Sequence, residues 1–260
     1  LLSSSTKLDF GYSENSAGLR LESWLGFENE WDFRSTRSIE FNFGVYSSGW
    51  DDRITRGNGI ASYSPGYWSY AEYRSPQGDQ FNYFAALEAE YNPEQELSWQ
   101  LSFGPEVYAT DNLTLSTFFS FGRKEHWLIW DSDTHQLAGY DSAFFNMNLG
   151  LDWYPSERHE VRIKFQWVGI DAEVVSGYML DDKGRLIISD SPSLNFSLSD
   201  TALQLRYRFQ IAPLSDIFLV YSRGGYYASQ SGEEGPGKLL REGWEDAMVE
   251  TFIAKIRYRF

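Results

Sequence analysis

The C-terminal stretch Glu250-Thr-Phe-Ile-Ala-Lys-Ile-Arg-Tyr-Arg-Phe260 decides the fold class of this chain. Successive side chains of a β-strand point to opposite faces, so a period of two separates two sets of residues. One set is aromatic and aliphatic, whereas the other carries Lys255, Arg257 and Arg259. The stretch is therefore predicted to be a strand with one apolar and one cationic face.

The same alternation recurs along the whole chain, and a helical period explains none of these segments as well. Phe81 and Leu87 share one face of their segment, while Glu88 and Glu90 lie on the other. Such segments cover residues 19–33, 39–45, 81–91, 97–103, 145–153, 161–167, 203–211 and 250–260, with weaker ones at 6–12, 66–74, 113–122 and 216–223. The sequence predicts about twelve antiparallel strands and no helix.

The connections between these segments fall into two sets. Short turns are expected at residues 34–37, 75–79, 110–112, 155–158 and 212–216. Long loops are expected at residues 47–65, 124–140, 170–195 and 224–244, with one short exception at 92–96. Short turns at one end and long loops at the other are typical of outer-membrane barrels, whose short turns are periplasmic and whose long loops are extracellular.

The predicted fold class is therefore all-β, an antiparallel transmembrane β-barrel of about twelve strands. A soluble β-sandwich also alternates, but it gives no reason for the loop lengths to segregate. The C-terminal stretch resembles the closing strand of bacterial outer-membrane barrels, which implies that Tyr258 and Phe260 form the assembly signal read by the barrel-assembly machinery.

Length and composition agree with this prediction. The chain has 260 residues, enough for a single β domain over 1–260, either a full barrel or the C-terminal part of a longer one. It has no cysteine, and its aromatic share of 18% fits the aromatic girdles of membrane barrels. The first residues contain neither an initiator Met nor a signal segment, so we expect a processed chain or a piece of a longer one.

Charge excludes one class of partner. The chain has 22 Lys and Arg residues against 37 Asp and Glu residues, which gives a net charge of −15. Nucleic-acid binding relies on cationic neutralisation of phosphates, so we expect no nucleic-acid partner. The expected surroundings are outer-membrane lipid and lipopolysaccharide.

Several runs together resemble a proteobacterial outer-membrane barrel family of unassigned function. They are Trp50–Gly59, Phe165–Glu173, Phe196–Phe209 and, most specifically, Pro213–Gly225. The resemblance covers most of residues 38–260. In that family the barrel follows a secreted module similar to family-nine carbohydrate-binding domains, which implies that this barrel anchors or exports an attached module. The family offers no catalytic residues to carry over.

Charged residues of the predicted interior are the candidate functional site. They comprise Asp32, Glu40, Asp152, Arg162, Lys164, Arg206, Arg208, Arg257 and Arg259. Acids dominate the early strands and bases the late ones, so closure of the barrel is expected to make them neighbours. One interpretation is a salt-bridged, filled interior, and the other is a charged constriction that selects solutes. We expect Arg206→Ala or Arg257→Ala to reduce stability more than conductance.

Other motifs predict no further chemistry. Asp131-Ser-Asp-Thr-His135 has metal-ligand residue types but lacks the distal Glu of a calcium loop, so we expect neither a metal nor a cofactor. The three histidines, at 126, 135 and 159, accompany no G-x-S-x-G elbow, so we name no catalytic residue. The aromatic run 63–73 is interpreted as an interfacial girdle rather than a sugar platform.

Three classes of function stay open from the sequence. A barrel in the outer membrane that anchors or exports an attached module fits the resemblance best. A solute channel fits the polar interior. An outer-membrane hydrolase rests on chain size alone.

Overall fold

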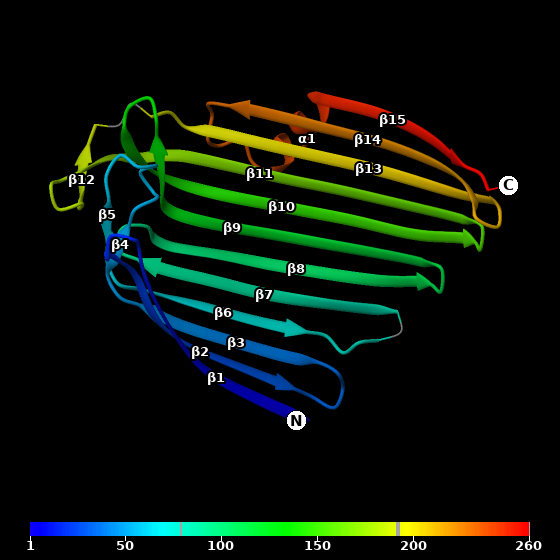
Figure 1. Cartoon of the computed structure of the whole chain (residues 1–260), viewed down its shortest axis with the longest axis horizontal. Helices are drawn as coiled ribbons and strands as arrows, with labels where there is room; N and C mark the ends of the chain where they lie inside the picture. The colour runs from blue at the N-terminus through cyan, green and yellow to red at the C-terminus, as the bar shows by residue number, and fades with distance from the viewer. Residues whose placement is uncertain (79, 191–192, 260) are drawn as a thin grey trace.

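The computed structural model describes residues 1–78, 80–190 and 193–259. It is almost entirely β-structure (Figure 1). The strands are β1 (Ser3–Glu14), β2 (Arg20–Asp32), β3 (Ser38–Tyr46), β4 (Gly49–Asp51), β5 (Ala61–Tyr63), β6 (Gly66–Arg74), β7 (Phe81–Asn92), β8 (Glu96–Thr110), β9 (Leu113–Asp131), β10 (Gln136–Ser156), β11 (His159–Leu180), β12 (Leu186–Ser189), β13 (Phe196–Ala212), β14 (Ser215–Ser229) and β15 (Ala247–Arg257). One helix, α1 (Pro236–Glu245), precedes the last strand.

Twelve of these strands form one antiparallel meander, which confirms the predicted number. They lie side by side in the order β1-β2-β3-β6-β7-β8-β9-β10-β11-β13-β14-β15. The short strand β12 pairs with β11, and β4 pairs with β5 in a separate hairpin. Within the described residues, β1 and β15 each pair on one side only and lie at opposite margins of the sheet (Figure 1).

The strand register separates an apolar face from a polar face across the whole sheet. Leu87 lies opposite Leu101, and Glu88 lies opposite Gln100 in the next position. We call the face that carries Leu87 and Leu101 the apolar face. The face that carries Glu88 and Gln100 is the polar face. Because the strand pairs keep this register apart from local bulges, such as the one between Gly139 and Tyr140, the predicted alternation extends over most of the sheet.

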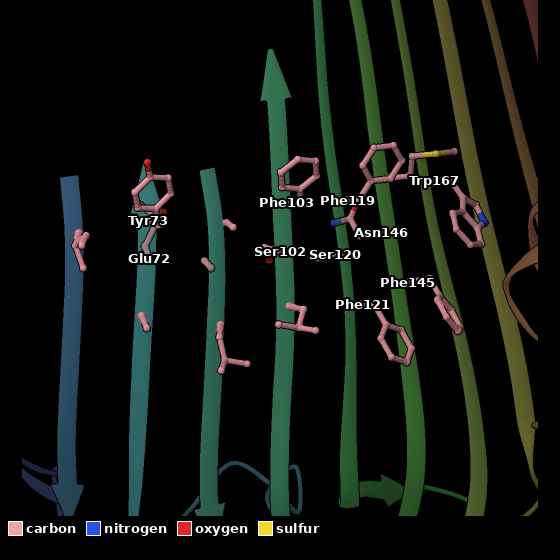
Figure 2. Close-up of a pocket in the computed structure, with 17 residues that line it drawn as sticks. Glu72, Tyr73, Ser102, Phe103, Phe119, Ser120, Phe121, Phe145, Asn146 and Trp167 are labelled. Atoms are coloured by element: carbon pink, nitrogen blue, oxygen red, sulfur yellow. The ribbon is translucent and has the colours of Figure 1, made fainter. Parts of the chain in front are cut away.

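Large side chains of the apolar face are widely exposed. The exposed fractions of Leu87, Leu101 and Phe103 are 45%, 50% and 42%. Figure 2 shows the rings of Phe103, Phe119 and Phe121 on neighbouring strands of this face, where they border a groove of 750 Å³. Among the described residues, α1 packs on this face over β11, β13 and β14, whereas Leu87, Leu101 and Phe103 have no second layer above them.

Aromatic rings on the polar face lie flat on glycine backbone. A Cβ atom at Gly44 would overlap the indole of Trp68, and one at Gly104 would overlap the ring of Phe84. Glycine is needed at both positions because only a missing side chain lets a neighbouring ring approach the strand so closely. The aromatic side chains thereby cover strand positions where glycine offers no side chain for packing.

The five expected short turns lie at one end of the sheet, and the expected long loops belong to the opposite end. The short-turn end has the connections β2–β3, β6–β7, β8–β9, β10–β11 and β13–β14, as predicted. At the opposite, long-loop end, the expected loop 124–140 is wrong: β9 continues to Asp131, and β10 begins at Gln136. The strands extend because Leu137, Ala138 and Tyr140 are buried there, with Tyr140 packed near Phe196.

The other long connections also contain regular structure. Strand β11 continues to Leu180 and β14 to Ser229, so both loops are shorter than expected. Hairpin β4–β5 and the segment before β12 meet at the long-loop end, where the Ser62 amide donates to the Gly184 carbonyl at 2.7 Å. This bond links a connection between β3 and β6 to one between β11 and β13. The two segments therefore lie together at this end of the sheet, and we call them the roof (Figure 1).

Helix α1 corrects the expectation that the chain has no helix. Its ten residues begin with Pro236 at the first helical position, which suits a helix start. Only Leu239 and Gly243 are buried, so the apolar stripe is too short to stand out in the sequence. Among the described residues, no helix is long and apolar enough to span a membrane.

The helix is held on the sheet by hydrogen bonds rather than by a large apolar contact. Thr201 shares the apolar face with Leu203, and its hydroxyl donates to the Gly243 carbonyl at 2.9 Å. Arg223 donates to the Trp244 carbonyl at 2.8 Å and lies over the Trp244 ring. Beneath α1 the apolar face carries polar residues such as Thr201 and Arg223, and the helix covers this part of the face.

The loop before α1 is fixed by two carboxylates. Asp171 accepts hydrogen bonds from the Gly235 amide at 2.8 Å and from the Ser197 hydroxyl at 2.7 Å. A negative charge at the start of a helix also interacts favourably with the helix dipole. Glu234 accepts hydrogen bonds from Tyr227, Ser229 and Lys238 at 2.9–3.0 Å.

We predict that acidification loosens α1. Burial opposes ionisation of Glu234, but hydrogen bonds from Lys238, Ser229 and Tyr227 outweigh it and hold its pKa below the ordinary value of 4.5. The stabilisation is therefore complete above pH 4.5 and is lost as the pH falls through the lowered pKa. Amide hydrogen exchange of α1, corrected for intrinsic rates, should be faster at about pH 3 than at about pH 7.

Two variants provide the controls for this experiment. Glu234→Gln should expose α1 to exchange at neutral pH and remove the pH effect, while Glu245→Gln, at an exposed position, should leave both unchanged. Equal protection of α1 in wild type and Glu234→Gln at neutral pH would contradict the assigned role.

Candidate functional site

The polar face is divided into an acidic and a basic half. The acidic half, on β1 to β8, carries Asp9, Glu22, Glu28, Glu30, Asp32, Glu40, Glu72, Glu88, Glu90 and Glu106, with Lys7, Arg20 and Arg74 as its cations. The basic half, on β11 to β15, carries Arg162, Lys164, Arg206, Arg208, Lys255 and Arg257, with Glu160, Asp200 and Asp216 as its acids. The predicted separation of charge by strand order is thus present on one face.

A chain of ion pairs crosses the basic half at the short-turn end. Arg162 lies 3.3 Å from Asp152 and 2.5 Å from Glu160. Arg208 links Glu160, at 3.6 Å, to Asp216, at 2.9 Å. Arg257 on the last strand completes the chain by pairing with Asp216.

Asp216 is the centre of this network, and sequence reasoning missed it. Its side chain is fully buried, whereas Arg208 and Arg257 keep 41% and 55% of their side-chain surface exposed. A buried carboxylate requires such partners, because an unpaired charge away from water is costly. The sequence placed Asp216 in a turn, and only the pairing of β14 with β13 and β15 shows that two guanidinium groups reach it.

The remaining predicted residues lie elsewhere on the polar face or at its end. Asp32 accepts a hydrogen bond from Ser3 at 2.7 Å, and Glu40 accepts one from Asn42 at 2.7 Å. Neither acid meets a base of the late strands, because the two halves lie at opposite margins of the sheet. The expected contact between early acids and late bases is therefore absent from the described structure.

Lys164 and Arg206 have no ion pair within the described residues, although both lie on the polar face. The Arg259 amide donates to the Ser215 hydroxyl at 3.0 Å, beside Asp216. Tyr258 follows β15, and Phe260 lies outside the described residues. The assembly signal predicted from these two aromatic residues stays a prediction.

A cavity of 570 Å³ lies on the polar face across β6 to β11. Trp68 and Tyr70 line it on one side, and Phe118 and Phe144 on the other. The polar residues that line it include Glu88, Glu90, Ser98, Gln100, Arg123, Lys124 and Asn146. The sequence predicts the alternation but not this cavity, since the cavity depends on how six strands are aligned.

A second cavity, of 590 Å³, lies beneath the roof at the long-loop end. Its walls include Tyr46, Trp50 and Tyr63, together with several carboxylates. The Tyr46 hydroxyl donates to Glu90 at 3.0 Å, and Glu90 lines both cavities. Glu90 therefore lies where the two cavities adjoin.

The residues considered for metal binding and hydrolysis make hydrogen bonds or close polar contacts with neighbouring parts of the chain. Asp131 accepts hydrogen bonds from the amides of Asp133 and Thr134, which fixes the β9–β10 turn. The His159 ring nitrogen lies 2.6 Å from the Tyr207 hydroxyl, and His126 lies 3.3 Å from Glu96. In the part of the chain that the structure describes, no group of three or more His, Asp and Glu side chains is placed to hold a metal ion.

Comparison with known proteins adds no assignment. No protein-family model matches the chain, and no curated protein matches it. The family resemblance of Pro213–Gly225 and the other runs therefore stays a prediction from the sequence.

We predict that two neighbouring arginines on β13 differ sharply in their contribution to stability. Arg208→Ala removes two ion pairs and leaves buried Asp216 with one partner, so the free energy of unfolding should fall by about 1–3 kcal/mol. Contrary to the expectation from the sequence, Arg206→Ala removes no ion pair of the described structure and should change the free energy of unfolding by no more than about 0.5 kcal/mol. Equilibrium unfolding in urea measures both values. Equal losses for the two variants would contradict the network.

Proposed function

We propose that the chain forms the wall of a transmembrane β-barrel in a bacterial outer membrane and that this barrel anchors or exports an attached module. The apolar face meets lipid, and the polar face lines the interior. The supporting observation is that the twelve strands share one mainly apolar face and one mainly polar, charged face. An antiparallel meander closed into a barrel satisfies the backbone hydrogen bonds for which lipid offers no partner.

The exposure of the apolar face favours lipid over water. Leu101 and Leu149 remain 50% and 36% exposed although they lie on inner strands of the sheet. Soluble monomers rarely leave apolar surface of this extent uncovered. Strands β9, β10 and β11 have 19, 21 and 22 residues, whereas crossing a bilayer takes about 9–11. The extra length fits a wall that continues beyond the membrane at its long-loop end.

The roof at the long-loop end favours an anchor over an open pore. Hairpin β4–β5 and the segment around Gly184 meet there, and Trp50 and Ile60 lie close to Gly184. Rings that lie flat on Gly44 and Gly104 further fill the polar face. A filled interior suits a barrel whose task is to hold or deliver an attached module.

We predict that a charge on the apolar face blocks insertion while the same charge on the polar face does not. Leu101→Arg should cost about 2–4 kcal/mol at the centre of a bilayer, whereas a residue that is half exposed to water would tolerate it. Gln100→Arg, one position away on the other face, should be nearly neutral. Folding into lipid vesicles, followed by protease protection and heat-dependent gel mobility, compares the two. Equal insertion of both variants would argue for a soluble sheet.

A solute channel is the second candidate, favoured by the acidic and basic halves of the polar face. Opposing walls of opposite charge can select solutes by their charge. Single-channel recording of the inserted chain separates the two functions. The anchor predicts no steady conductance in wild type and brief openings after deletion of residues 50–62, which removes most of the β4–β5 roof. Steady, charge-selective conductance in wild type would favour the channel.

A further inference from the structure

We propose that the 570 Å³ cavity on the polar face binds a neutral oligosaccharide. The inference goes beyond the anchoring function, and it rests on that proposal only in taking the polar face as the barrel interior. The cavity is lined by aromatic rings at both ends and by planar hydrogen-bonding groups between them.

The aromatic rings have the placement of stacking platforms. The Trp68 indole lies against the backbone of Gly44. The ring also extends towards Gly26, where an added Cβ atom would lie 3.6 Å from Cζ2 of Trp68. One side of the ring is thereby held against the strands, while the residue lines the cavity and is only partly buried. A ring that is fixed in this way presents a flat apolar surface at little cost in side-chain entropy.

A second aromatic group closes the far side of the cavity. The Phe144 ring is packed edge-on against Trp127 at 5.0 Å, and the Phe118 ring is stacked on Phe84 at 6.1 Å. Strands β6 and β10 are four positions apart, which corresponds to about 19 Å. The cavity can therefore hold several linked rings, each with apolar faces and polar edges.

The groups between the aromatic ends suit vicinal hydroxyl groups. The Glu88 carboxylate, the Gln100 amide and the Asn146 amide are planar and can each hold two hydroxyls in one plane. In the described part of the chain, Glu88 has neither an ion pair nor a hydrogen bond. Lys124 also lacks a carboxylate partner there and lies over the rings of Trp127 and Phe144. Both charges are available to a ligand.

The mixed charge of the cavity selects against ions. A cation would be attracted by Glu88 and Glu90 but repelled by Lys124, and an anion would meet the reverse. A neutral polyhydroxylated ligand can use the carboxylates as acceptors and the ammonium group as a donor at once. Apolar walls with a few polar groups that fix orientation are the common form of small-ligand sites.

The test uses the full chain folded in detergent, titrated calorimetrically with maltohexaose, cellohexaose and spermine. We expect saturable binding of at least one oligosaccharide and none of spermine. Trp68→Ala should weaken the oligosaccharide by about tenfold or more, because it removes a stacking surface. Trp153→Phe, which alters an aromatic residue on the apolar face, should leave the affinity unchanged.

A second variant guards against a loss of folding in Trp68→Ala. Glu88→Ala truncates an exposed side chain without partners, so the fold should persist while oligosaccharide affinity falls. Binding of spermine in place of sugar, or no binding by a chain that inserts normally into vesicles, would overturn the oligosaccharide site. Failure of insertion itself would instead count against the barrel, so the two outcomes are distinguishable.

Discussion

Backbone pairing between antiparallel strands, in a register interrupted only by local bulges, is the constraint on which the rest of this structure depends. Because side chains alternate along a strand, a slip of one residue would move every apolar side chain to the opposite face. The pairs Leu87–Leu101 and Phe103–Phe119 show how the register keeps large side chains on one face from strand to strand. The apolar surface, the charged surface and the cavity on it all follow from that alignment.

The two faces are stabilised by different means. On the apolar face, large side chains contact one another within a single layer and leave much of their surface free, which suits a wall in lipid. On the polar face, glycines let Trp68 and Phe84 lie close to the backbone, and ion pairs join neighbouring strands. Asp216 shows the consequence: a buried carboxylate is tolerated because Arg208 and Arg257 reach it from the strands on either side.

The margins and ends of the sheet are the part of the structure that the proposed barrel must account for. Strands β1 and β15 each present an unpaired edge in the described structure, and a membrane wall must have both edges matched. At the long-loop end, the β4–β5 hairpin reaches the segment around Gly184. The proposed anchor and the proposed sugar-binding cavity are compatible, since both take the polar face as the interior of a barrel.

The sequence by itself determined the strands, their number and the two faces, because each depends on a local period of two. It also located the acids on early strands and the bases on late ones. It misplaced residues 124–140, because Leu137 and Tyr140 extend the strands by packing that involves distant residues such as Phe196. It also missed α1, whose short apolar stripe is fixed by Thr201 and Asp171. Only the tertiary structure decided that Asp216 meets two arginines and that Trp68 and Phe144 face one cavity, since these contacts join strands far apart in sequence.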